Sequence, residues 1–161
     1  MHAAAPADLI QCRIDDRGEA GHVAYVTVNN PEKRNTLGMP EVRVGIPSGM
    51  EANLLPALIG WGKAAELIFT GDIIDADEAF RCGFLQKLVP AAQLDAAVEK
   101  MVASILLGGP RAIRLQKRLM RDWERMSLTD GIWQGIRACV AARSTDEPRR
   151  MMEAFIARKR K

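Results

Sequence analysis

The chain has 161 residues, with 23 Lys and Arg against 20 Asp and Glu, and a formal net charge of +3. A content of 48% hydrophobic and 27% charged residues is typical of a folded globular protein and excludes a disordered chain. This length suits one domain with its own core. No apolar run approaches the roughly 20 residues that span a membrane, and the N-terminal residues lack the basic and apolar regions of a secretory signal. We therefore expect a cytoplasmic protein with no membrane partner.

The cysteines and histidines form no disulfide or metal pattern. Cys12, Cys82 and Cys139 are far apart and odd in number, which predicts reduced, mostly buried thiols rather than a disulfide framework. His2 and His22 are the two histidines, and the sequence contains no C-x-x-C or H-E-x-x-H motif. We therefore expect no metal site. The glycine-rich phosphate loops of the common nucleotide-binding folds are also absent from the sequence.

Charge is unevenly distributed along the chain. Residues 111–161 contain 14 Lys and Arg and 6 Asp and Glu, a net charge of +8 that leaves −5 for the remainder. A basic segment suits a polyanion, either nucleic acid or a phosphorylated small molecule. No aromatic stacking platform or nucleic-acid-binding motif accompanies the charge, so we expect no nucleic-acid partner. The alternative is a solvated helical surface.

Strands are predicted early in the chain. Residues 9–14 and 22–28 are the first two, joined by a turn at 15–18, and the second alternates β-branched and aromatic residues with small or polar ones. Pro31 ends it because proline cannot donate to a ladder. After a polar loop, the alternation of residues 40–46 predicts a third strand.

Short helices follow. Residues 51–59 and 63–69 are predicted helices, separated by glycines. Asp75, with Glu78 three residues later, is typical of a capping box that starts a helix running to Cys82, and Gly83 is expected to stop it. Residues 84–89 then predict a strand that ends at a proline.

The remainder is predicted to be helical. Apolar residues recur with helical period over 94–106, and a Gly-Gly-Pro break precedes a second helix that carries Trp123. Ser127 is expected to open a third helix, and Ser144 with Glu147 to cap a fourth. Strands are few for so much amphipathic helix, because such helices need an apolar surface to cover. Either the sheet is very small, or part of it is missing from this chain.

Four segments together resemble the crotonase superfamily, the enoyl-CoA hydratase/isomerase family. They match its N-x-P-x-x-x-N-A-L loop, its P-E-x-x-x-G-x-x-P segment, its T-G-x-x-x-x-A-x-E-A-x-x-x-G-L run and its A-F-x-x-K-R close, at residues 22–37, 40–47, 70–84 and 155–160. The resemblance implies an α/β fold: a crotonase-type spiral of ββα units over residues 1–90, and a helical C-terminal trimerisation region over 91–161. It also implies a homotrimer or a dimer of trimers.

The connection from Leu37 to Pro40 departs from the family pattern. Only Gly38 and Met39 lie between them, whereas the resemblance implies most of the spiral core there, with the backbone amides of an oxyanion hole and a first acidic catalytic position. Either roughly a hundred residues are truly deleted, judged against single-domain length, or the printed sequence omits an internal segment. We favour the second, because deletion leaves helix faces uncovered and strand edges unpaired.

The resemblance implies chemistry on an acyl-CoA thioester, catalysed by Glu41. The expected activity is that of an enoyl-CoA hydratase-like lyase, which adds water across the α,β-double bond while a carboxylate transfers the proton and an oxyanion hole stabilises the thioester oxygen. An isomerase or another crotonase reaction is the alternative within the family. A truly deleted chain favours a rival, a non-catalytic CoA-binding or oligomerising protein.

The resemblance also implies a binding site for coenzyme A. The loop residues correspond to the part of the family that approaches the nucleotide end of the coenzyme. The C-terminal residues correspond to a terminal helix that often reaches the coenzyme of a neighbouring subunit. In both places a cation suits phosphate, and a ring suits adenine. Solvated charge and a core phenylalanine are the competing interpretation. Coenzyme A is part of the substrate, so no separate cofactor is expected. The implied substrate-binding residues are Lys33, Arg34, Thr36, Leu37, Phe155 and Arg158.

Overall fold

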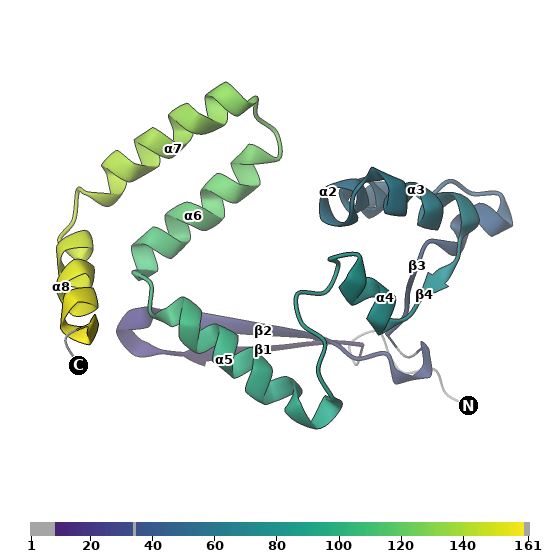
Figure 1. The fold of residues 1–161 in the computed structure, drawn as a ribbon, viewed down its shortest axis with the longest axis horizontal. Coiled ribbons are helices and arrows are strands. Elements are labelled where there is room, and N and C mark those ends of the chain that lie inside the picture. The colour runs from purple at the N-terminus through teal and green to yellow at the C-terminus, as the bar shows by residue number, and fades with distance from the viewer. Residues whose placement is uncertain (1–8, 34, 160–161) are drawn as a thin grey trace. The chain divides into compact units, whose positions relative to one another are not determined.

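The computed structural model describes residues 9–33 and 35–159, and the chain divides into two compact units (Figure 1). The first combines Met1–Arg13 with Tyr25–Leu94, and the second combines Ile14–Ala24 with Asp95–Lys161. The β hairpin at the start of the chain therefore contributes its open end to the first unit and its turn to the second.

Strands β1 (Ile10–Asp16) and β2 (His22–Val28) form that hairpin, as predicted. The Asp16 carboxylate accepts a hydrogen bond from the Gly18 amide at 2.8 Å. Gly18 has φ +61°, a conformation that glycine adopts without steric cost, and it begins the 3-10 helix η1 (Gly18–Ala20). Across the strands, the Arg13 guanidinium stacks 4.1 Å from the centroid of the Tyr25 ring. Local turn chemistry therefore sets the hairpin.

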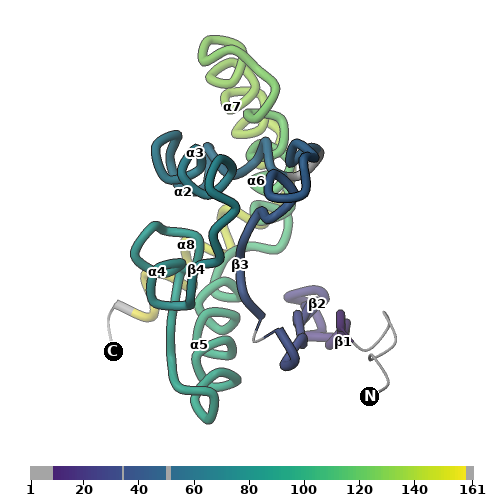
Figure 2. Tube along the Cα trace, turned by 90° about the vertical axis from the view of Figure 1, so that its right-hand side faces the viewer, coloured from purple at the N-terminus to yellow at the C-terminus, as the bar shows by residue number. Residues whose placement is uncertain are grey.

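The rest of the first unit is built from short elements (Figure 2). Two-residue strands β3 (Leu37–Gly38) and β4 (Ile73–Ile74) pair antiparallel, with Leu37 opposite Ile74. The described residues of this unit also form four 3-10 helices and three α-helices. In chain order these are η2 (Pro31–Lys33), η3 (Pro40–Val44), η4 (Met50–Leu54), α2 (Leu55–Ile59), α3 (Trp61–Thr70), α4 (Ala76–Arg81) and η5 (Ala91–Gln93).

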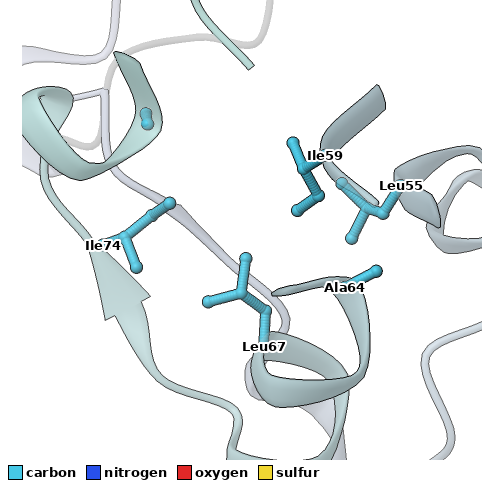
Figure 3. Packing of buried hydrophobic residues seen from close by; sticks show 6 residues of the cluster. Leu55, Ile59, Ala64, Leu67 and Ile74 are labelled. Atoms are coloured by element: carbon cyan, nitrogen blue, oxygen red, sulfur yellow. The ribbon is translucent and has the colours of Figure 1, made fainter. Parts of the chain in front are cut away.

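A small apolar core joins α2, α3, α4 and β4 (Figure 3). Leu67 of α3 is fully buried, at 0% exposure, and points toward Ile74 of β4 in Figure 3. Leu55 and Ile59 approach from α2, and Ala79 from α4. Burying such aliphatic side chains contributes roughly 1.5–3 kcal/mol each, so this cluster is the main source of stability in the first unit.

The chain is continuous across the short connection between Leu37 and Pro40. Leu37 packs against the core cluster, and Gly38 lies so close to β4 that an added Cβ would stand 3.0 Å from the Asp72 carbonyl oxygen. The junction is therefore a folded part of the chain.

Two predicted strands are wrong. Residues 40–46 instead contain the 3-10 helix η3, because Pro40 presets a helical first turn and Gly45, at φ +78°, closes the helix in the left-handed conformation. Residues 84–89 form no strand among the described residues; Phe84 and Leu85 pack against the core cluster instead. An alternating pattern becomes a strand only where a neighbouring strand accepts its backbone hydrogen bonds.

The predicted helices of the first unit are confirmed, and an ion-pair network joins two of them. Asp75 caps α4 by accepting from the Glu78 amide at 2.8 Å. The Lys63 ammonium of α3 lies 2.8 Å from carboxylate oxygens of both Glu66 and Glu78. Hydrogen bonds to Glu66 and then Glu78 raise the pKa of Lys63 above its usual range. The hydrogen bond from Lys63 is likewise the main reason that the pKa of Glu78 is lowered.

Replacing Lys63 with glutamine is expected to destabilise the first unit at pH 7 but much less at pH 3. A carboxylate with a lowered pKa stabilises the fold above its unfolded pKa of about 4.3, and this contribution is lost as the pH falls through the folded pKa. Urea denaturation at both pH values measures the difference between variant and wild type. Lys87→Gln, at an exposed position, is the control, and an equal Lys63→Gln effect at both pH values would contradict the prediction.

The second unit is made of four longer helices, all of them predicted. They are α5 (Leu94–Leu106), α6 (Pro110–Trp123), α7 (Leu128–Ala142) and α8 (Glu147–Lys159). Helices α6 and α7 pack against each other as a helical hairpin (Figure 1), and Ser127 caps α7 by accepting from the Asp130 amide at 3.2 Å. No helix in the described ranges is long and apolar enough to cross a membrane.

Glu147 does not act in the cap that the sequence predicts for α8. Its carboxylate is buried, at 8% exposure, and accepts hydrogen bonds from the amides of Arg111 and Ala112 at 3.1 and 3.0 Å. These amides belong to the first turn of α6, where donors have no partner within the helix. Gly109 makes room for the carboxylate, since an added Cβ would stand 2.5 Å from Oε1 of Glu147. Glu147 therefore ties the start of α8 to the start of α6.

The cysteines are free thiols, but two of them are not buried as expected. Cys12 and Cys139 are exposed and Cys82 is half-buried. Cys12 lies on β1, and nearly all residues of this strand are exposed. Cys139 lies on α7, whose apolar side chains are also exposed. Cys12 and Cys139 are therefore exposed because the faces of the strand and the helix that carry them are not covered by other elements in the described part of the chain.

Candidate functional site

A pair of asparagines shapes the loop that carries the predicted coenzyme-binding residues. The Asn30 side-chain oxygen accepts from the Lys33 amide at 3.3 Å, and its backbone oxygen accepts from the Asn35 amide at 3.0 Å. The Asn35 side chain in turn accepts from the Asn30 amide. Asn35 has φ +50°, in the left-handed region that asparagine tolerates better than most residues. The loop is therefore closed on itself.

Lys33 and Thr36 lie together in an open hollow of about 640 Å³ beside this loop. We call it the Lys33 hollow. Its size is within the usual range for small-molecule sites, and the Lys33 ammonium gives it a cation that suits phosphate. The lining residues are Glu32, Lys33, Thr36, Gly38, Pro40 and Ile73.

Glu41, the predicted catalytic residue, follows Pro40 directly at the first turn of η3. Its carboxylate is exposed, and Oε2 accepts a hydrogen bond from the Ser48 hydroxyl at 2.9 Å. The nearby Arg43 does not pair with it: its Nε donates to the Thr70 carbonyl oxygen at 2.9 Å, and its guanidinium pairs with Asp72. Because an ionised carboxylate has about four acceptor positions, Glu41 can accept further hydrogen bonds.

A second hollow of about 560 Å³ contains Leu37. This Leu37 hollow shares Thr36 and Ile73 with the Lys33 hollow, so the two meet at the β3–β4 ladder. Its lining is mainly aliphatic and aromatic, which suits an apolar group. The lining residues are Asn35, Thr36, Leu37, Ile73, Ile74, Asp75, Ala76, Ala79, Phe84 and Leu85.

Phe155 and Arg158 lie together in the second unit. With Leu107 and Gly108 they line an open hollow of about 480 Å³, so a ring and a guanidinium share one site, as the coenzyme-binding hypothesis requires. The structure thus groups Lys33 with Thr36 in one unit and Phe155 with Arg158 in the other. Arg34, the remaining predicted residue, lies outside the described residues.

Some neighbours of the site were not predicted from the sequence. Ser48 lies beyond the end of η3, so no single helix or strand brings it to Glu41. Asn30 and Asn35 could have been noted, because asparagine favours turns and left-handed backbone. In the described part of the chain, no group of three or more His, Cys, Asp or Glu side chains could hold a metal ion.

The sequence comparisons identify a family. Residues 36–161 match the sequence model described as Enoyl-CoA hydratase/isomerase. The chain is 33% identical over 124 residues to a crotonyl-CoA hydratase of Syntrophomonas wolfei, across 76% of this chain and 48% of that protein. It is 36% identical over 96 residues to a short-chain-enoyl-CoA hydratase of Clostridioides difficile, across 59% of this chain and 62% of the relative.

Solved structures give the same assignment. An enoyl-CoA hydratase from Bacillus anthracis superposes with a TM-score of 0.71 at 31% identity, over 76% of this chain and 48% of its own. An enoyl-CoA hydratase from Mycobacterium marinum gives 0.67 at 30% identity, over 76% and 49%. The chain thus spans about half the length of these proteins, and the predicted α/β crotonase-type fold with part of its core missing is confirmed. The chain belongs to the enoyl-CoA hydratase/isomerase family.

Proposed function

We propose that this chain binds an acyl-CoA thioester and takes part in the addition of water across its α,β-double bond. The observation that carries the proposal is the position of Glu41, a carboxylate with free acceptor capacity directly after Pro40 of the Lys33 hollow. It lies within the segment that matches the family. The names of the relatives, crotonyl-CoA and short-chain-enoyl-CoA hydratase, support the same substrate class.

Glu41 is the proposed general acid and base. Water that adds to the double bond must lose one proton, and the α carbon must gain one, so a carboxylate at the site can hold the proton between these steps. Ser48 orients the carboxylate by donating to Oε2 at 2.9 Å, and it leaves Oε1 for the reaction. The expected contribution of such a group is roughly 10²–10⁴ in rate.

The substrate itself supplies the coenzyme, so the reaction needs no separate cofactor. Lys33 is the proposed contact for its phosphates. By the family resemblance, Phe155 and Arg158 are proposed to contact the adenine ring and phosphates of the coenzyme that a neighbouring subunit binds. Thr36 lines both the Lys33 hollow and the Leu37 hollow, and Leu37 lines the second, whose mainly apolar lining suits the apolar part of the substrate. The two hollows share a wall, so a ligand with a charged part and an apolar part matches the chemistry of both.

A homotrimer or a dimer of trimers is the assembly that we propose. Its support is α7, which exposes an apolar stripe at helical spacing; such a stripe is usually covered by another helix. The stripe contains Leu128, Ile132, Ile136 and Val140, and Trp133 lies beside it.

Coenzyme A binding without turnover is the second candidate function. Its support is the length of the chain: the family resemblance assigns the amides of the oxyanion hole to the stretch missing between Leu37 and Pro40, and these donors are usually the largest source of rate in such sites. An isomerase or another acyl-CoA reaction is the alternative within the enzyme class, because the missing stretch would also hold the residues that decide between them.

Two measurements on the purified chain test these functions. Hydration of crotonyl-CoA removes the ultraviolet absorbance of the conjugated thioester, and calorimetry measures coenzyme A binding. Turnover above the buffer rate supports the hydratase. Binding without turnover supports the second candidate, and absence of both overturns the acyl-CoA assignment. Double-bond migration in a 3-enoyl-CoA would raise the same absorbance and indicate an isomerase.

A further inference from the structure

Helix α3 is apolar on more of its surface than one core requires. Ala64 and Leu67 face the core and are 0% exposed, whereas Trp61 and Phe69 are 80% and 76% exposed. Residues at positions 61, 65 and 69 recur every four residues and share one side of the helix. A helix at the surface of a protein needs only one apolar stripe, about 100° wide. The second stripe of α3 therefore has the composition of a covered surface.

The exposed apolar surface continues onto the elements beside α3. Helices α2 and η3 both pack against α3, and both carry exposed aliphatic residues. We define the outer apolar face by its five members, which are between 54% and 80% exposed: Val44, Ile46, Leu58, Trp61 and Phe69. Exposed apolar side chains on neighbouring elements usually mark an interaction site.

The β3–β4 ladder also has no third strand beside it among the described residues. It consists of two residues in each strand, and in the described part of the chain each strand has only the other as its partner. An isolated two-stranded ladder is marginal in water, and its outer edges keep unpaired amides and carbonyls that another strand can engage. Ile73 of β4 is 62% exposed, so the apolar surface extends to this ladder.

The comparisons show how much of a longer relative has no counterpart in this chain. The Bacillus anthracis enzyme superposes on 76% of this chain with only 48% of its own, so about half of its fold has no counterpart here. The family match begins at Thr36, one residue before β3. In a single fold of twice this length, the matched half lies against the other half.

We propose that the outer apolar face and the β3–β4 edge bind a separate polypeptide that carries the missing half of the enoyl-CoA hydratase fold. The inference rests on the shared fold and not on the proposed reaction. A second copy of this chain fits the surface less well. It would bring the same two-residue strands and the same half of the fold, and it would leave the missing elements unsupplied.

The test uses the part of the Syntrophomonas wolfei hydratase that lies outside the 124 matched residues as the partner. This fragment is produced in the same cells as the full 161-residue chain, which carries an affinity tag. We expect recovery of a 1:1 complex, a blue shift of the Trp61 fluorescence, and slower hydrogen exchange at residues 37–38 and 73–74. The Trp61→Phe variant identifies that shift, because Trp123 and Trp133 also fluoresce.

Two charged substitutions separate this face from other apolar surfaces. Phe69→Lys places a charge on the outer apolar face and is expected to lower capture of the fragment at least tenfold. Leu128→Lys places the same charge at the exposed start of α7, where Leu128 is 83% exposed, and is expected to leave capture unchanged. Circular dichroism checks that both variants fold. No complex with the wild-type chain, or loss of capture with Leu128→Lys alone, overturns the proposal, as does self-association that buries Trp61 and excludes the fragment.

Discussion

Replacing Glu41 with glutamine is expected to lower the rate of crotonyl-CoA hydration about 100-fold or more. A loss of this size corresponds to roughly 2.7 kcal/mol in the activation free energy. Glutamine has nearly the same shape as glutamate, and its amide oxygen can still accept from the Ser48 hydroxyl that lies 2.9 Å from Oε2 in the wild type. The variant therefore loses the ability to hold a proton while its surroundings are preserved.

Binding and turnover are measured separately to interpret this result. The hydration rate of crotonyl-CoA is measured for the chain alone and for the chain mixed with the unmatched fragment of the Syntrophomonas wolfei hydratase. The affinity for coenzyme A is measured by calorimetry. We expect the affinity to change little, because Glu41 is not among the lining residues of the Lys33 hollow. Glu124→Gln, a substitution at an exposed position near the end of α6, is the control. Turnover by Glu41→Gln at the wild-type rate would rule out the role of this carboxylate.

Replacing Glu147 with alanine is expected to destabilise the second unit by about 3 kcal/mol, since hydrogen bonds to a charged group contribute roughly 1.5–3 kcal/mol each. Two amides of α6 lose their acceptor in this variant: those of Arg111 and Ala112, which donate at 3.1 and 3.0 Å. Water replaces the carboxylate poorly because the site is buried. The negative charge near the start of α6 is also lost, and a helix N-terminus favours such a charge.

Urea denaturation followed by circular dichroism measures this effect. Glu147→Gln keeps one acceptor oxygen and is expected to lose less stability than Glu147→Ala. Glu153→Ala, at an exposed position on α8, is the matched control and should stay within about 0.5 kcal/mol of the wild type. Gly109→Ala is expected to have a similar effect to Glu147→Ala, because its Cβ would displace the same carboxylate. Equal stability of Glu147→Ala and Glu153→Ala would contradict the assignment.

Elements that depend on local chemistry could be predicted from the sequence. The apolar period of residues 94–106 gives α5 with the bounds that the structure has, and the side chains of Asp75 and Ser127 cap α4 and α7 as expected. Each of these signals lies within one or two turns of the residues that it orders. The alternation at residues 40–46 failed because a strand needs a partner elsewhere in the chain, whereas Pro40 and Gly45 favour a helical turn locally.

In the candidate site, too, local motifs could be predicted from the sequence, whereas contacts between distant residues could not. Lys33, Thr36, Phe155 and Arg158 were predicted from motifs. The structure places the first two at one hollow and the last two at another, and their roles in binding stay predictions. The contact between Ser48 and Glu41 could not be predicted, because it depends on how the chain turns after η3. Glu147 was expected to act in the cap of α8. Its carboxylate accepts instead from two amides of α6, which lie 36 and 35 residues away in sequence.

The accessible thiols of Cys12 and Cys139 lie on different units of the chain. Cys82 is less exposed, and its Sγ donates to the Ala79 carbonyl oxygen at 3.4 Å, so a brief maleimide reaction should modify the other two first. A donor dye and an acceptor dye on this natural pair would report the separation of the units by resonance energy transfer. The distance between the two units can therefore be measured with the natural cysteines, without introducing new labelling sites.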